Sequence, residues 1–251
     1  MNKEYSLFDA HFHIIDPRYP IVENNGYIPD PFTIHDYFAR FDGIQPVGGA
    51  VVSGSFQAYD QTYLLDALEV LGPKYVGVIQ LAPTVTENKL ITLHQVGVRA
   101  VRINLMRGGK EQLQYLEKFA KSIFEIVGWH IELYIDSANL SDLYQILINL
   151  PAVCIDHLGL SKVGFSTLLK LAEHDIHIKA SGFGRVNFDV VTALKEIYSI
   201  NPNCLMFGTD LPSTRSPRPY HDNDIKLVTG AFESEAVNNI LCMNALEFYK
   251  I

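Results

Sequence analysis

The stretch CLMFGTDLP (204–212) joins a short apolar run to an aspartate, Asp210, and a Leu-Pro step. A short continuous apolar run that ends in turn residues is typical of a strand buried on both faces. Runs of the same kind precede it along the chain, at 6–12, 47–54, 75–81, 98–105, 130–136, 152–156 and 176–182. The run at 204–210 is therefore the eighth in a series of predicted strands.

Helical patterns lie between these runs. In residues 63–71 and again in 113–126, apolar side chains recur three and four positions apart, which predicts amphipathic helices. Eight strands thus alternate with about eight helices. The strands are largely apolar rather than strictly alternating, as expected for a parallel sheet that is covered on both faces.

The alternation fits both an open doubly wound sheet and a closed barrel, so a second observation must choose between them. Polar side chains recur at the carboxyl ends of many predicted strands: His11, His13, Ser55, Arg102, Tyr134, His157, Arg185 and Asp210. A barrel gathers all strand ends around one mouth, whereas an open sheet spreads them along an edge. No GxGxxG motif follows the first run. We predict an α/β fold, a (β/α)8 TIM barrel in which residues 1–251 form a single domain.

Composition excludes several function classes. The chain has 251 residues, 48% of them hydrophobic, and a formal net charge of −8 without a Lys/Arg cluster, which opposes binding to nucleic acid or to an anionic membrane. No apolar run approaches the ~20 residues that cross a bilayer, and the first residues lack the basic region and apolar core of a signal peptide, so we expect none. The three cysteines lack CxxC spacing and suit reduced thiols. We expect a cytoplasmic protein.

The first predicted strand carries the motif HFH, with histidines at positions 11 and 13. Residues two apart on a strand point to the same side, so the two imidazoles are expected to converge. Two long irregular stretches, 16–31 and 211–224, follow the first and last strands, and we expect both to face the mouth of the barrel.

Each polar residue also has a structural interpretation. A single strand histidine is more often hydrogen-bonded than catalytic, and either Asp156 or His157 could satisfy loop amides. Asp210 could cap the following turn. Arg102 stands between Val101 and Ile103 and could form an ion pair inside the barrel.

Four motifs together match a known family. DAHFH (9–13), VRAVRINL (98–105), CIDHLG (154–159) and FGTDLP (207–212) resemble the amidohydrolase superfamily, in the branch of the 2-pyrone-4,6-dicarboxylate lactonases and sugar lactonases. The resemblance covers nearly the whole chain, with the motifs in the expected order at the expected strand ends.

The resemblance also indicates whether a metal ion is needed. Binuclear members use HxH, a carboxylated lysine on strand 4, histidines on strands 5 and 6, and an aspartate on strand 8, whereas here Arg102 and Tyr134 stand on strands 4 and 5. The dicarboxylate lactonase needs no metal, so the resemblance implies no obligatory cofactor. The alternative is one zinc or manganese ion held by His11, His13 and Asp210.

The resemblance also implies roles. Asp210 corresponds to the base that activates water, and His11, His13 and His157 correspond to the groups that polarise the lactone carbonyl. Substrate-binding positions match Tyr27, Ser55, Arg102, Tyr134 and Arg185.

The sequence departs from the family at two arginine positions. Leu160 replaces an arginine that grips a carboxylate, and Arg107 is followed by Gly108. Arginine offers a planar fork for carboxylates that neither leucine nor glycine can supply. Arg215 and Arg218 could compensate from the last loop, or could be solvated loop charges.

These observations predict a hydrolase of a small carboxylated or hydroxylated lactone, with an anionic small molecule as its partner. Two alternatives stay open: a mononuclear metal-dependent hydrolase or decarboxylase of the same superfamily, and a barrel that binds an acidic metabolite without catalysis. The C-terminal stretch 234–249 could pack on the barrel or on a second subunit, so a homo-oligomer is compatible with the sequence.

Overall fold

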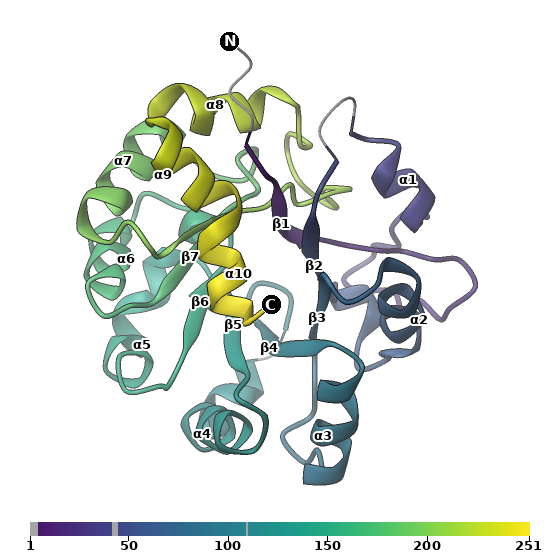
Figure 1. The fold of residues 1–251 in the computed structure, drawn as a ribbon. Coiled ribbons are helices and arrows are strands. Elements are labelled where there is room, and N and C mark those ends of the chain that lie inside the picture. Colours follow the sequence, from purple (N-terminus) through teal and green to yellow (C-terminus); the bar gives the residue numbers. More distant parts are fainter. Residues whose placement is uncertain (1–4, 42–44, 109) are drawn as a thin grey trace.

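Eight parallel strands form the centre of the molecule and follow one another around it in sequence order (Figure 1). The computed structural model describes residues 5–41, 45–108 and 110–251. The strands are β1 (Phe8–Phe12), β2 (Gly48–Val52), β3 (Tyr75–Ile79), β4 (Val98–Asn104), β5 (His130–Tyr134), β6 (Val153–Ile155), β7 (His177–Ala180) and β8 (Leu205–Phe207). Each lies within one of the predicted runs, so the predicted (β/α)8 TIM barrel is confirmed.

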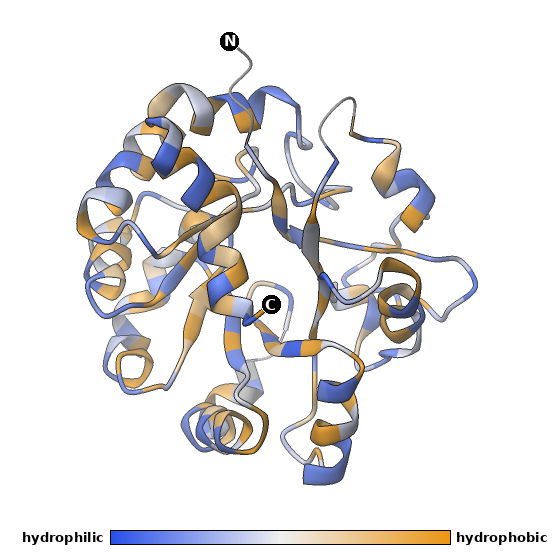
Figure 2. Ribbon diagram, viewed as in Figure 1, coloured by the Kyte–Doolittle hydropathy of each residue, from blue (hydrophilic) through white to orange (hydrophobic). Residues whose placement is uncertain are grey.

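Helices surround the strands on the outside (Figure 1). They are α1 (Ile34–Phe38), α2 (Thr62–Leu71), α3 (Glu87–Gln95), α4 (Leu116–Val127), α5 (Leu140–Leu147), α6 (Phe165–Ala172), α7 (Val190–Ile200), α8 (Asn223–Ala231), α9 (Ser234–Asn238) and α10 (Asn244–Tyr249). The helix predicted over 113–126 begins later, because its first residues belong to a 3-10 segment, Lys110–Tyr115. Such tighter turns are frequent at helix N-termini. The helices carry both hydrophobic and hydrophilic residues, as amphipathic packing on a sheet requires (Figure 2).

The segment after β8 joins the barrel to β1. The backbone N–H of Asp210 donates to the carbonyl of His11 at 2.7 Å, and that of His13 donates to the carbonyl of Leu211 at 2.7 Å. This approach requires Gly208, since a Cβ there would lie 2.7 Å from the backbone nitrogen of His11. The first and last predicted strands are thereby brought together where both carry site residues.

The C-terminal helix α10 closes the end of the barrel where the strands begin (Figure 1). Tyr249 is buried in a cluster with Phe8, Ala10 and Met206, and its hydroxyl donates to Glu132 Oε1 at 2.6 Å. The stretch 234–249 therefore packs on this chain's own barrel. The three cysteines are buried and form no disulfide. Throughout the described residues, no helix has the length and apolar character needed to cross a membrane.

Candidate active site

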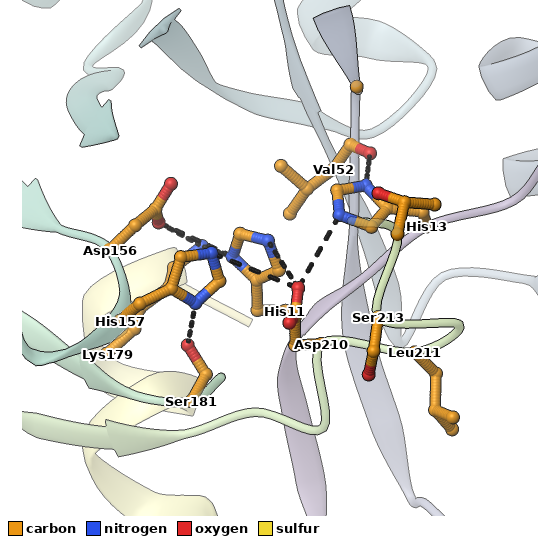
Figure 3. A network of polar contacts seen from close by, with 12 residues as sticks. His11, His13, Val52, Asp156, His157, Lys179, Ser181, Asp210, Leu211 and Ser213 are labelled. Atoms are coloured by element: carbon orange, nitrogen blue, oxygen red, sulfur yellow. Dashed lines mark hydrogen bonds and ion pairs between the residues drawn. The ribbon is translucent and has the colours of Figure 1, made fainter. Parts of the chain in front are cut away.

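Three imidazoles converge on one carboxylate at the carboxyl end of the strands (Figure 3). The Nε2 atoms of His11, His13 and His157 lie 4.0, 3.8 and 3.9 Å from Asp210 Oδ1. All four side chains are buried, and among the described residues neither Asp210 Oδ1 nor His11 Nε2 has a hydrogen-bond partner. The predicted convergence of the two HFH histidines is confirmed.

Backbone and side-chain contacts orient the outer two rings. His13 Nδ1 lies 2.6 Å from the carbonyl oxygen of Val52 on β2, and His157 Nδ1 lies 2.9 Å from Ser181 Oγ (Figure 3). Gly182 follows this serine at φ +58°, and a Cβ there would lie 2.6 Å from His157 Nδ1. Gly182 is thus required for the position of His157.

Asp210 is anchored through its second oxygen. Arg185 Nε donates to Oδ2 at 2.6 Å, and Arg185 Nη2 donates to the carbonyl of Thr214 at 2.8 Å. Burial alone would raise the pKa of the Asp210 carboxyl, but the charge of Arg185 and the neighbouring histidines together outweigh burial and hold the pKa well below its usual range. Asp210 is therefore ionised, with Oδ1 free to accept a proton.

Burial keeps two of the histidines uncharged. It lowers the pKa of His157 to about 3. The pKa of His11 is held well below its usual range by burial and by the charge of Lys179. At neutral pH each of these rings therefore offers one N–H and one lone pair.

Arg102 is buried and bound by groups that directly follow two other strands of the barrel. Its Nε and Nη2 donate to Asp156 Oδ2 at 3.0 and 2.8 Å, and its Nη1 donates to the carbonyl of Ser53 at 3.0 Å. The guanidinium also lies 5.0 Å from the ring centre of Tyr134. The contacts match the ion-pair interpretation, and Asp156 serves this pair rather than loop amides. The predicted role of Arg102 in substrate binding stays a prediction.

A cavity of about 30 Å³ opens above these groups, with room for a water molecule or two. It is lined by His13, Gly54, Ser55, Phe56, Arg102, Asn104, Arg107, Tyr134, His157, Arg185, Asp210, Thr214 and Arg215. The predicted substrate-binding residues thus gather here, with one exception. Tyr27 is not in this lining, and instead its ring lies beneath the guanidinium of Arg215, at 4.4 Å.

Both long loops cover the cavity, as predicted. Arg215 Nη1 donates to Asn24 Oδ1 at 3.1 Å, and its Nη2 donates to the carbonyl of Asn24. Ser55 Oγ donates to the same amide oxygen at 3.1 Å, and Asn24 Nδ2 donates to the carbonyl of Arg107 at 3.3 Å. Arg218 lies elsewhere, paired with Asp224 at 2.9 Å. Of the two loop arginines, Arg215 alone lines the cavity.

Sequence reasoning left several contributors unassigned. Arg107 and Arg215 line the cavity, and in the described part of the chain neither forms an ion pair with a carboxylate. Burial and the neighbouring charge of Arg107 lower the pKa of Arg215. Arg215 had been named only as a possible replacement for the absent arginines, and Asn24, Lys179 and Glu132 were missed. A charged residue inside an apolar strand, as in IHIKASG (176–182) and HIELYID (130–136), was the available signal for the last two.

The site offers groups of the kind that bind metal ions. Ligand atoms of His11, His157 and Asp210 lie within 4.8 Å of one another, whereas the sequence suggested His13 as the second histidine. Cations already occupy the surroundings, since Lys179 Nζ lies 3.4 Å from His11 Nδ1 and Arg185 is bonded to Asp210. A divalent cation would add a further positive charge at this point. These positive charges oppose a bound cation, and we derive no step through a metal.

Two neutral histidines and an ionised aspartate are buried at the carboxyl ends of the barrel strands. Active sites of barrel enzymes lie at this face, so the fold and the site together are those of a barrel enzyme. The chain belongs to the amidohydrolase family, whose model matches residues 8–251. It is accordingly a hydrolase of the amidohydrolase superfamily.

Two relatives have low sequence identity to this chain, but the similarity extends over most of its length. The chain is 25% identical over 236 residues to a 2-pyrone-4,6-dicarboxylate hydrolase from Comamonas testosteroni, covering 81% of this chain and 76% of the relative. It is 26% identical to a 4-sulfomuconolactone hydrolase from Rhizobium radiobacter, covering 82% and 75%. The crystal structure of a probable 2-pyrone-4,6-dicarboxylic acid hydrolase from Acinetobacter baumannii superposes with a TM-score of 0.85 at 24% identity, covering 98% and 100%. This last likeness shows the shared fold.

Proposed function

We propose that this protein hydrolyses a small anionic lactone, with Asp210 as the general base. The observation that carries the proposal is the convergence of three imidazole Nε2 atoms, at 3.8 to 4.0 Å, on a carboxylate oxygen that has no hydrogen-bond partner among the described residues. Two relatives named for lactone hydrolysis support the choice of a cyclic ester.

In the proposed reaction, a water molecule donates a hydrogen bond to Asp210 Oδ1 and attacks the lactone carbonyl carbon. The carbonyl oxygen becomes an oxyanion, which accepts hydrogen bonds from those imidazoles that present an N–H to the site, His11 among them. The ring C–O bond then breaks, and the leaving alkoxide takes the proton from Asp210, so that lactone and water give a hydroxy acid. A placed base contributes about 10²–10⁴ in rate and a placed oxyanion donor about 10²–10³.

Arg185 couples substrate binding to the base. Because Arg185 is bonded to Asp210 Oδ2, it keeps the pKa of this carboxyl low and its proton affinity weak. An anionic substrate group that draws the guanidinium away raises the pKa of Asp210 and so strengthens the base. Anionic lactones are therefore expected to activate their own hydrolysis, whereas neutral lactones of the same size do not.

The anionic group of the substrate first meets Arg107 and Arg215 at the mouth, before it reaches Arg185 beside Asp210. The guanidiniums of Arg107 and Arg215 line the cavity, and neither is paired with a carboxylate in the described residues. Arg215, which lines the cavity, is held in place by Asn24 from the loop after β1. An anion that competes for Arg215 would release this contact.

A lactone screen tests the proposal. Five- and six-membered lactones with a carboxylate or sulfonate are compared with neutral lactones of matched ring size, with and without a chelator, by following proton release and the ring-opened product. We expect turnover of anionic members that the chelator leaves unchanged. Loss of turnover in chelator, restored by zinc or manganese, would favour the metal-dependent alternative. A lactone that raises the melting temperature but is not turned over would favour the binding barrel.

A further inference from the structure

Lys179 lies on β7 inside the barrel, next to His11, and is fully buried (Figure 3). Its Nζ lies 2.5 Å from Glu132 Oε2, 3.7 Å from Asp156 Oδ1 and 3.4 Å from His11 Nδ1. This lysine belongs to none of the motifs that indicated the family, and the proposed reaction gives it no role. Its contact with His11 places a buried ammonium beside an imidazole of the proposed site.

The lysine is charged. Burial alone would lower the pKa of its ammonium, but the carboxylates of Glu132 and Asp156 outweigh burial and raise it. Glu132 shows the matching shift in the opposite direction, since Lys179 and His130 hold the pKa of Glu132 at about 2 against the effect of burial. An ammonium has three hydrogen-bond donors and no acceptor. Whatever lies within hydrogen-bonding distance of Lys179 Nζ must therefore accept.

His11 Nδ1 has two charged neighbours at the same distance, and hydrogen-bond geometry distinguishes them. Lys179 Nζ and Asp156 Oδ1 both lie 3.4 Å away. The contact with Lys179 has the geometry of a hydrogen bond, whereas Asp156 Oδ1 has no hydrogen-bond partner in the part of the chain that the structure describes. His11 Nδ1 therefore accepts from Lys179 and carries the lone pair of the neutral ring.

We infer that Lys179 is a positioning residue that fixes His11 as the Nε2–H tautomer, so that its single N–H faces Asp210, where the proposed reaction takes place. The use of this N–H in turnover rests on the proposed function, whereas the tautomer itself does not. A divalent cation would need a lone pair at His11 Nε2, with the proton on Nδ1 given to an acceptor. The ammonium of Lys179 opposes that arrangement.

The second histidine of the HFH motif is held the opposite way. His13 Nδ1 lies 2.6 Å from the carbonyl oxygen of Val52, which can only accept, so this nitrogen carries a proton. In its neutral form His13 therefore turns a lone pair toward Asp210, while His11 turns an N–H toward it. The two imidazoles of one strand thus differ as donor and acceptor, which their identical residue type conceals.

The wild-type protein tests the inference directly. Nitrogen NMR of protein labelled with ¹⁵N-histidine distinguishes the two neutral tautomers, and the spectrum of a His11→Gln variant assigns the signal. We expect His11 to be neutral with its proton on Nε2. A proton on Nδ1 would overturn the inference, and no substrate is needed, so this result is independent of the proposed function.

A charge-removing variant tests the cause. Lys179→Met combined with Glu132→Gln removes both members of the ion pair, which frees His11 Nδ1 to donate to Asp156 Oδ1. We expect the Nδ1–H tautomer, tighter zinc binding by calorimetry, and a kcat for a lactone substrate lower by about 10²-fold at similar KM. A Nε2–H tautomer in this folded variant would refute the role of Lys179.

Tyr249→Phe is the matched control. Tyr249 donates to Glu132 at 2.6 Å, so this change weakens the same buried network without touching the contact between Lys179 and His11. We expect a lower melting temperature with the His11 tautomer and the zinc affinity of the wild type. A tautomer change here as well would reduce Lys179 to a structural role. Should the double variant not fold, the wild-type spectrum still decides.

Discussion

The interior of the barrel and its mouth differ in whether their positively charged side chains are paired with carboxylates. The interior cations are each bonded to a carboxylate, in the pairs Arg102 with Asp156, Arg185 with Asp210, and Lys179 with Glu132. At the mouth, Arg107 and Arg215 line the same cavity, but neither has a carboxylate partner among the described residues. One cavity thus has a neutralised floor and a positively charged rim, in a chain whose net charge is −8.

Desolvation explains the difference. A fully buried charge costs several kcal/mol unless a partner and hydrogen bonds compensate it, so interior cations persist only in pairs. The rim arginines are only partly buried and keep some solvation, and they repel each other when no anion is present. Interior charge therefore orients catalytic groups, and rim charge is available to a ligand. The following changes test this division, from the largest expected effect to the smallest.

Removing the base should have the largest effect. Asp210→Asn keeps the shape of the side chain but cannot accept a proton, so we expect kcat for a lactone substrate to fall about 10²–10⁴-fold, measured by steady-state kinetics. Asp224→Asn is the control, because Asp224 also binds an arginine, Arg218, but lies outside the cavity lining. Unchanged turnover in Asp210→Asn would remove this residue from the mechanism.

Breaking an interior pair should cost stability. Arg102→Met leaves Asp156 buried without its main partner, and we expect the free energy of unfolding to fall by about 3–5 kcal/mol in denaturant titrations. Arg218→Met is the comparison, since its side chain is 46% exposed and its surface pair should contribute at most about 1 kcal/mol. Equal losses in the two variants would contradict the division between interior and surface charge.

Removing a rim charge should change binding more than chemistry. For Arg107→Gln and Arg215→Gln, we expect the KM of an anionic lactone to rise about 10–10²-fold each, because a hydrogen bond to a charged group contributes about 1.5–3 kcal/mol. The melting temperature should stay near the wild-type value, and Arg218→Gln should leave KM unchanged. A rise in KM that is just as large for a neutral lactone would show that these arginines do not bind the negative charge of the substrate.

The smallest expected effect is on how the free energy of unfolding changes at acid pH. The pKa of Glu132 is about 2 in the fold and about 4.5 in an unfolded chain. A lowered folded pKa means that the unfolded state binds more protons, so this stabilisation is present above pH 4.5 and is lost as pH falls toward 2. We expect a flatter pH dependence of unfolding in Lys179→Met/Glu132→Gln and an unchanged one in Arg215→Gln. Identical slopes in all three proteins would argue against the interior pair as the cause.

The sequence predicted more of the site than its isolated motifs suggest. Because barrel strands end at one face, the positions of His11, His13, His157 and Asp210 at strand ends were enough to predict their convergence. The partners were not predictable in the same way. Arg102 could have bound substrate or Asp156, since a guanidinium serves both and the choice depends on which carboxylate lies nearest. Arg215 reached the cavity only because the loop after β8 folds back onto Asn24.

What the sequence determined by itself was the periodic pattern: eight apolar runs, the helices between them, and the polar residues that end the strands. These follow from side-chain spacing, which is a local property of the chain. Tertiary structure alone decided which nitrogen of His11 carries its proton, since Lys179 lies 168 positions away in the chain. It also decided which arginines stay without an acidic partner. Partner choice depends on distances of a few ångströms across the barrel, and electrostatic energies change steeply over such distances.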